Sequence, residues 1–237
     1  MQTSRVLFVV TSADMMGNAP DPTGSWIEEV AAPYYAFTDA KYDVTIASPL
    51  GGQAPLDPTS LREENATAST RRFEADVKAQ AALAHTIKLS TVEFASYDAI
   101  FFPGGHGTME DFPKDATVKA AVEYFYQSGK PLSSVCHGPA CLVEAVKPTG
   151  EPVIKGHSFT CFTDEEETTV GLDKLVPFLL ESRLSSQGGK VRREKPFQPN
   201  VVVDKNLITG QNPASSIPAA EAVIHRLRAR QQLSDAA

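Results

Sequence analysis

Residues 5–10 read Arg-Val-Leu-Phe-Val-Val, an almost continuous apolar run that is rich in β-branched side chains. Such a run is typical of a strand that helices bury on both faces of a parallel sheet. Similar runs, separated by stretches with helical periodicity, occupy residues 43–47, 99–102, 131–135, 200–203 and 207–209. This alternation predicts an α/β fold with a mostly parallel central sheet covered by helices.

Helices are expected at residues 26–37, 118–126 and 219–230, with a short one at 140–146. The first has apolar side chains close to a 3.6-residue period, although Pro33 should bend it or disturb its middle. A long loop is expected at 11–23, after the first strand. The polar stretch around 50–90 is predicted to be an insertion that packs over the sheet edge or the crevice. Nothing resembles a linker, so residues 1–237 are predicted to form a single domain.

Composition excludes several classes of function. The formal net charge of −7 argues against sequence-independent nucleic-acid binding, which requires Lys and Arg to neutralise phosphates. We find neither a run of about 18 apolar residues nor a signal peptide, so no membrane partner is expected. Three cysteines without a CxxC pair suit a reducing compartment, and the cytoplasm is the expected location. Five scattered histidines show no metal-binding spacing, so neither a metal nor a cofactor is predicted.

The residues that follow two of the apolar runs are rich in chemical groups. In parallel sheets the ligand crevice lies beyond the carboxyl ends of the strands. One run leads into Pro-Gly-Gly-His-Gly-Thr at 103–108, and another leads into Cys136-His137-Gly138-Pro139. The free N–H groups of the helix expected after Cys136 would favour a thiolate there. Cys136 is therefore a candidate nucleophile, and the alternative is a buried structural cysteine.

Other groups near these junctions could assist such a nucleophile. The N–H groups of Gly104 and Gly105, together with that of His137, are candidate oxyanion donors, unless the glycine pair only makes a tight turn. With relaxed backbones, His137 cannot easily point the same way as its neighbour Cys136, so we expect it to flank the sulfur. Carboxylates occur at Glu28-Glu29 and at 164–167, where the alternative is a solvated acidic surface.

Five blocks in order make a resemblance recognisable. They are Thr-Gly-Ser-Trp-Ile-Glu-Glu at 23–29 with Pro33-Tyr34, Phe-Pro-Gly-Gly-His-Gly-Thr at 102–108, Val-Cys-His-Gly-Pro-Ala at 135–140, Phe-Thr-Asp-Glu-Glu-Glu at 162–167, and Thr-Gly-Gln-Asn-Pro-Ala-Ser-Ser at 209–216. The chain resembles the ThiJ/PfpI superfamily of class I glutamine-amidotransferase-like proteins, and within it the glyoxalase III and heat-shock chaperone branch. The resemblance implies a flavodoxin-like three-layer sandwich with the cysteine on a strand-to-helix elbow, and commonly a homodimer.

The resemblance also implies a catalytic site. Its nucleophile falls on Cys136 and its imidazole on His137. Its buried glutamate, held protonated against the cysteine, falls on Glu29, which we expect to matter more to the thiolate than His137 does. The acid that orients the histidine falls on Glu167, with Glu166 as the fallback. Gly104, Gly105 and His106 are expected at the oxyanion and substrate-binding position.

The implied activity is that of a cofactor-free glyoxalase acting on a small 2-oxoaldehyde. It would convert methylglyoxal and water to lactate through a cysteine hemithioacetal. Three rival functions stay open: a protein or nucleotide deglycase, a holdase chaperone in the stress response, and a cysteine hydrolase acting on amides or isonitriles.

Overall fold

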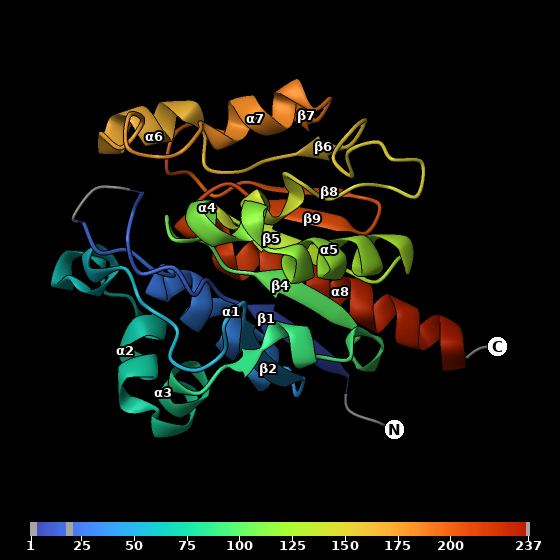
Figure 1. Ribbon diagram of the computed structural model, residues 1–237. Helices are drawn as coiled ribbons and strands as arrows, with labels where there is room; N and C mark the ends of the chain where they lie inside the picture. The colour runs from blue at the N-terminus through green and yellow to red at the C-terminus, as the bar shows by residue number, and fades with distance from the viewer. Residues whose placement is uncertain (1–3, 18–20, 236–237) are drawn as a thin grey trace.

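A seven-stranded sheet forms the centre of the molecule (Figure 1). The computed structural model describes residues 4–17 and 21–235, so part of the loop expected at 11–23 lies outside it. The strand order is β3-β2-β1-β4-β5-β9-β8, and only β8 runs antiparallel to its neighbour. The strands are β1 (Arg5–Val9), β2 (Asp43–Ser48), β3 (Ile87–Lys88), β4 (Ala99–Phe102), β5 (Leu132–Val135), β8 (Val201–Asp204) and β9 (Leu207–Gly210). The predicted mostly parallel sheet is confirmed.

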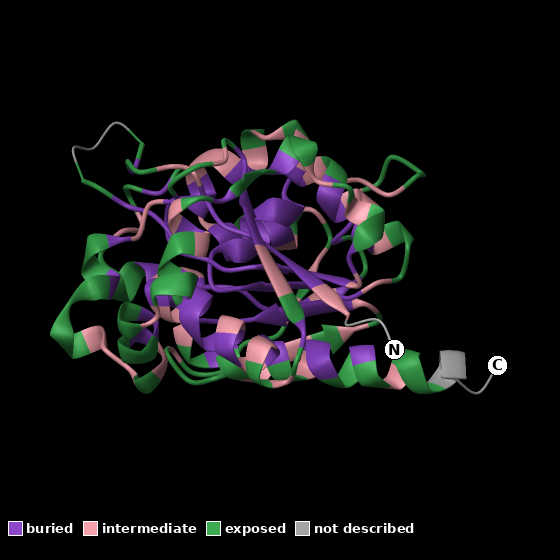
Figure 2. Ribbon diagram, turned by 90° about the horizontal axis from the view of Figure 1, so that it is seen from below, coloured by how far each residue is buried: buried purple, intermediate pink, exposed green. Residues whose placement is uncertain are grey.

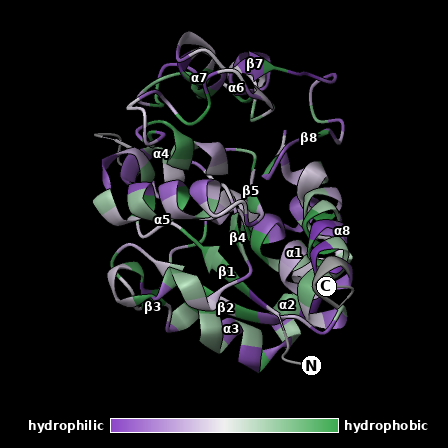
Figure 3. Cartoon of the chain, turned by 90° about the vertical axis from the view of Figure 1, so that its right-hand side faces the viewer, coloured by the Kyte–Doolittle hydropathy of each residue, from purple (hydrophilic) through white to green (hydrophobic). Residues whose placement is uncertain are grey.

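Helices cover both faces of the sheet and complete three layers (Figures 1 and 3). On one face lie α1 (Ile27–Asp39) and α8 (Ser216–Asp235), and on the other lie α4 (Thr108–Asp111) and α5 (Ala116–Gln127). Near β8, a second sheet of two parallel strands, β6 (Ser158–Phe159) and β7 (Lys190–Val191), accompanies α6 (Asp164–Val170) and α7 (Leu180–Ser186). The predicted insertion contains α2 (Ala68–Ala75) and α3 (Val77–Ala84), which pack beside α1 and β2. The flavodoxin-like arrangement is therefore confirmed.

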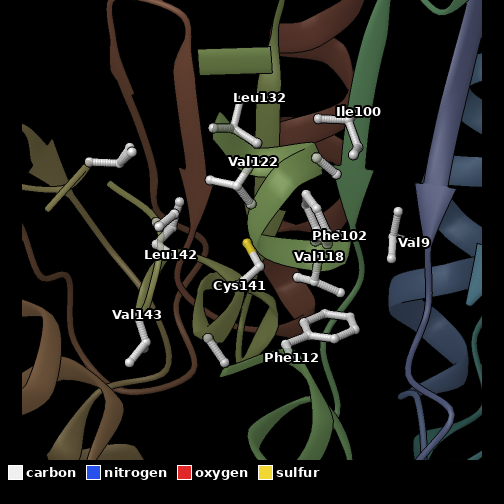
Figure 4. Packing of buried hydrophobic residues seen from close by; sticks show 14 of the residues in the cluster. Val9, Ile100, Phe102, Phe112, Val118, Val122, Leu132, Cys141, Leu142 and Val143 are labelled. Atoms are coloured by element: carbon white, nitrogen blue, oxygen red, sulfur yellow. The ribbon is translucent and has the colours of Figure 1, made fainter. Parts of the chain in front are cut away.

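The core has two halves because successive side chains of each buried strand point to opposite faces. Val6 and Phe8 of β1 pack with α1 and α8, whereas Leu7 and Val9 pack with α5. In Figure 4 Val9 lies in the same cluster as Ile100 and Phe102 of β4 and Val118 and Val122 of α5. Figure 2 shows the buried sheet enclosed by helices whose outer faces are exposed. This explains why the central strands β1 and β4 are apolar along nearly their whole length.

Phe37 packs in an aromatic cluster between α1 and the sheet. Its ring centroid lies 5.7 Å from that of Phe8 and 6.1 Å from that of Phe101, both in edge-to-face geometry. We expect Phe37→Leu to lower the free energy of unfolding by roughly 1–2 kcal/mol, because the aliphatic side chain loses these ring contacts and fills less volume. Urea denaturation followed by circular dichroism measures the change. No loss of stability would contradict this account of the core.

One local expectation differs from the structure. The helix expected at 140–146 is wrong: a 3-10 helix, Gly138–Leu142, occupies this segment, and Val146 then pairs with Pro152 in a β-bridge. The segment between the elbow and this bridge is short and buried, and it turns with tighter hydrogen bonds such as Val143 N–H to the Ala140 carbonyl. Pro33, by contrast, does not interrupt α1.

Across the described ranges, no helix has both the length and the apolar character needed to cross a bilayer.

Candidate active site

A cavity of about 700 Å³ opens near the carboxyl ends of β4 and β5. In the sheet order, β2 lies on one side of β1 and β4 lies on the other, so the chain changes direction across the sheet at β1. Doubly wound sheets bind ligands at such switch points. Residues of the predicted insertion, between Asp57 and Thr67, form part of its wall. Of the residues predicted for the site, Glu29, Gly105, His106, Cys136 and His137 line the cavity, while Gly104 and Glu167 contact them from behind.

Cys136 occupies a strained elbow between β5 and the 3-10 helix. Its φ of 59° lies in the left-handed region, which non-glycine residues rarely adopt. Two hydrogen bonds hold this backbone: the Cys136 N–H donates to the Gly210 carbonyl at 2.9 Å, and the Cys136 carbonyl accepts from the Phe162 N–H at 2.9 Å. Gly138 completes the turn, because a Cβ at this position would collide with the Phe102 carbonyl. The fold thus imposes this conformation on the cysteine.

The same backbone conformation decides where His137 points. Its Nδ1 lies 3.3 Å from the Cys136 sulfur. Our expectation that His137 flanks the sulfur is therefore wrong, because it assumed relaxed backbones on both residues, and Cys136 does not have one. The histidine ring packs against Phe162, with 4.6 Å between ring centroids. An imidazole nitrogen is thus within proton-transfer reach of the thiol.

Glu167 holds two histidines at once. His137 Nε2 donates to Oε2 at 2.6 Å, and His106 Nε2 donates to Oε1 at 2.7 Å. Burial alone would raise the pKa of Glu167, but His137 and His106 outweigh it and hold the pKa well below its usual range. Because the carboxylate can only accept, the proton of a neutral His137 resides on Nε2, and Nδ1 keeps a lone pair for the Cys136 thiol.

Glu166, the fallback for this role, has another task. Its Oε2 accepts from the Thr163 N–H and hydroxyl in a capping box at the start of α6. Its Oε1 accepts from the Phe197 N–H at 2.7 Å and from Asn212 Nδ2 at 2.8 Å. Glu166 therefore ties three loops together, and its oxygens have no hydrogen bond with His137 among the described residues.

Glu29 is a fully buried carboxyl beside Cys136. Its Oε2 accepts the Gly104 N–H at 2.7 Å. Burial raises its pKa to about 8, although Cys136 and the Gly104 N–H oppose the shift. Oε1 has no hydrogen-bond partner among the described residues. At neutral pH the side chain is thus mostly protonated, and an acidic O–H is available next to the sulfur.

The raised pKa of Glu29 predicts a pH-dependent stability. The folded pKa of about 8 exceeds the ordinary glutamate pKa of 4.5, so the stabilisation from the bound proton is complete below pH 4.5 and lost as the pH rises through 8. Glu29→Gln removes this loss. Between pH 5 and pH 9 we expect the melting temperature of the variant to rise relative to wild type by roughly 5–10 °C. Calorimetry at the two pH values tests this, and parallel curves would contradict a buried proton on Glu29.

The protonation state of the Cys136 sulfur differs from the expectation drawn from the sequence. Burial raises the pKa of the Cys136 thiol, and an ionised Glu29 would raise it further, so the site does not favour the thiolate expected from a helix start. The short 3-10 helix that follows supplies little helix dipole. Burial lowers the pKa of His137, and the nearby His106 lowers it further, so the imidazole is neutral at pH 7 and can accept a proton. Cys136 is thus a resting thiol with a base beside it.

Two of the three predicted oxyanion donors are free. The Gly104 N–H is taken by Glu29, so the structure contradicts its prediction as an oxyanion donor. Within residues 4–17 and 21–235, the N–H groups of Gly105 and His137 have no hydrogen-bond partner. Gly105 has a φ of 107°, a backbone conformation that would be strained in a residue with a side chain. These two amides are therefore free to act as oxyanion donors.

Sequence reasoning missed the contact between His106 and Glu167, which are 61 residues apart. The ligand atoms of His106, His137 and Glu167 lie within 4.8 Å of one another, a set of ligand types that metals also use. Here the carboxylate and the two imidazoles satisfy one another by hydrogen bonds. The aromatic lining from Trp26, Phe162 and Phe197 was also missed. These residues come from three separate segments, and no periodic pattern links them.

A strand-to-helix elbow that carries a cysteine at the switch point of a doubly wound sheet defines a broad class of α/β proteins. Within that class, this chain belongs to the DJ-1/PfpI family, whose model matches residues 27–226. That assignment agrees with the resemblance drawn from the five sequence blocks.

Individual relatives extend the comparison. Glyoxalase 3 of Candida albicans is 30% identical over 85% of this chain and 89% of the relative. The Protein/nucleic acid deglycase HchA of Pseudomonas aeruginosa is 27% identical over 82% of this chain and 69% of the relative. The X-ray structure of the Rapid Encystment Protein 24 kDa of Francisella tularensis superposes with a TM-score of 0.91 at 36% identity, covering 95% of this chain and 99% of that one.

Proposed function

We propose that the protein is a glutathione-independent glyoxalase that converts methylglyoxal and water to lactate. The observation on which this rests is the position of the Cys136 sulfur, 3.3 Å from a base at His137 Nδ1 and next to the protonated Glu29. A protein thiol placed in this way can form a hemithioacetal with the aldehyde, so glutathione need not supply the thiol. The similarity to Glyoxalase 3 of Candida albicans supports the same activity.

The first step would join the sulfur to the aldehyde carbon. Cys136 Sγ attacks while its proton passes to His137 Nδ1, and the carbonyl oxygen becomes an alkoxide facing the N–H groups of Gly105 and His137. The alkoxide then recovers the proton from His137, which leaves a neutral hemithioacetal and a neutral imidazole. Glu167 keeps the imidazole oriented throughout.

The later steps would move protons between the two carbons. His137 removes the proton from the carbon that is bonded to the Cys136 sulfur, while Glu29 protonates the neighbouring carbonyl oxygen, which gives an ene-diol. His137 then delivers its proton to the second carbon, Glu29 recovers a proton from the first hydroxyl, and a thioester results. Water cleaves the thioester, releasing lactate and restoring the thiol.

Lactate formation from methylglyoxal in the absence of glutathione tests this function. We expect the purified protein to produce lactate in amounts equal to the methylglyoxal consumed. Consumption without lactate, or no consumption, would overturn the proposal.

A deglycase is the second candidate, because it would use the same residues and because the HchA deglycase is a relative. Parallel kinetics on free methylglyoxal and on a purified methylglyoxal adduct separate the two: a higher kcat/KM on the adduct would favour the deglycase. A holdase and a hydrolase are distinguished by different readouts. Suppression of client aggregation that survives Cys136→Ala would favour a holdase, and ammonia release from amides would favour a hydrolase.

The homodimer and the cytoplasmic location remain predictions. All three cysteines are free thiols, which fits a reducing compartment. Analytical ultracentrifugation would determine the oligomeric state.

A further inference from the structure

The cavity is much larger than methylglyoxal requires. It measures about 700 Å³, which is in the range of pockets for drug-sized ligands. Methylglyoxal has only a few non-hydrogen atoms and occupies roughly 100 Å³, judged by the ~30 Å³ share of a water molecule in the liquid. Most of the space beside Cys136 therefore remains for another part of a substrate.

Aromatic rings lead from the catalytic imidazole to the protein surface. The Phe162 ring lies 4.6 Å from that of His137, and the Phe197 ring lies 6.3 Å from that of Phe162. Phe162 is buried, whereas Phe197 is 44% exposed. Trp26, next to the start of α1, lines the same cavity. This lining suits a flat, apolar substituent extending outward from the reacting carbons.

Phe197 is held in place at a conformational cost. Its φ of 62° is in the left-handed region, which is a genuine outlier for a bulky residue. The buried carboxylate of Glu166 accepts the Phe197 N–H at 2.7 Å and fixes the loop. A strained backbone that directs a large, half-exposed apolar side chain into a cavity wall indicates a specific role for the ring.

The charge of the wall has one sign. Glu28, Asp57 and Glu64 line the cavity, and no Lys or Arg is among its described lining residues. Burial raises the pKa of Glu28, and the hydrogen bond that Glu28 accepts from the Thr67 hydroxyl opposes this shift. Asp57 accepts from the Thr59 N–H at 2.8 Å, so both acids are fixed in the wall. A negatively charged substituent would find no cation here and would be repelled.

We propose that this site selects α-dicarbonyl substrates whose second substituent is bulky, mainly apolar and free of negative charge. Phe197 is the specificity-determining residue, and Trp26 provides a further part of the apolar wall. The substrate class rests on the proposed glyoxalase function, but the binding preference of the cavity can be measured separately from it.

Three 2-oxoaldehydes test the preference: methylglyoxal, phenylglyoxal and 4-carboxyphenylglyoxal. We expect kcat/KM for phenylglyoxal to exceed that for methylglyoxal by about tenfold or more. We expect kcat/KM for 4-carboxyphenylglyoxal to be about tenfold lower than that for phenylglyoxal. Similar values for all three compounds would overturn the proposal. Higher activity on the carboxylate than on its neutral analogue would overturn it as well.

Variants locate the preference in the wall. Phe197→Ala should lower the ratio of kcat/KM for phenylglyoxal to that for methylglyoxal by about three- to tenfold, and Phe197→Leu by less. Leu175→Ala, at an equally exposed apolar residue that does not line the cavity, is the matched control and should leave the ratio unchanged. Glu28→Gln should narrow the gap between the charged and neutral compounds, whereas Glu221→Gln, on exposed α8 surface, should not. An unchanged ratio in Phe197→Ala would exclude the assigned role.

A binding measurement separates this proposal from the glyoxalase reaction. Trp26 is the single tryptophan of the chain, so its fluorescence reports on the cavity. In the Cys136→Ala variant, acetophenone should change this fluorescence at about tenfold lower concentration than 4-acetylbenzoate. If this difference appears while the wild-type protein forms no lactate from methylglyoxal, the cavity preference stands and the glyoxalase function fails. If wild type forms lactate but the variant binds the two probes equally, the glyoxalase function stands and the cavity preference fails.

Discussion

Replacing Cys136 by alanine should lower glyoxalase activity at least about a thousandfold, because no other group in the cavity can form the covalent hemithioacetal. The cavity is lined by Cys136 alone among the three cysteines. Lactate formation from methylglyoxal, measured at saturating and at low substrate, gives both kcat and kcat/KM. Mass spectrometry of wild type incubated with the aldehyde should show the added mass on the peptide that contains Cys136.

Cys141 provides a matched control for the loss of a buried thiol. It lies on the 3-10 helix that follows Cys136, but its side chain packs in the opposite half of the core with Phe112 and Val122 (Figure 4). Cys141→Ala should keep its activity within about threefold of wild type, because only core packing changes. Comparable activity in Cys136→Ala and wild type would show that another residue is the nucleophile.

Replacing Glu29 by glutamine should lower kcat by about a hundred- to ten-thousandfold, the usual contribution of a positioned acid or base. Glutamine has nearly the same shape, and its carbonyl can still accept the Gly104 N–H. It cannot deliver and recover a proton. The defect should therefore appear in turnover more than in substrate binding, and steady-state kinetics separate the two.

The pH profile gives this variant a second readout. In wild type, activity should fall as the pH rises through about 8, because Glu29 loses the proton that it donates. The residual activity of Glu29→Gln should lack this limb. If Glu29→Gln is as active as wild type at every pH, His137 alone moves the protons, and the assignment of Glu29 as an acid is wrong.

Local sequence was sufficient for much of the fold. Apolar runs such as residues 5–10 form strands, because an uninterrupted β-branched run can be buried only between two layers of helices. The positions of Cys136 and Gly105 at strand ends followed from the same pattern, since the carboxyl ends of parallel strands meet at one edge. The helix expected at 140–146 was wrong because periodicity does not register the β-bridge that ends the segment.

The chemistry of the site depended on contacts that periodicity does not describe. Strand boundaries, which are local properties, placed a cysteine and a histidine near one sheet edge, whereas Glu29 and Glu167 were assigned to the site only by the family resemblance. Only the tertiary structure decided that the strained backbone of Cys136 brings its sulfur to His137 Nδ1. It also decided that Glu167 accepts a hydrogen bond from His106 and that Glu29 accepts the Gly104 N–H. It also decided the protonation states, because burial and neighbouring charges set a pKa, and both arise when segments distant in the sequence pack together.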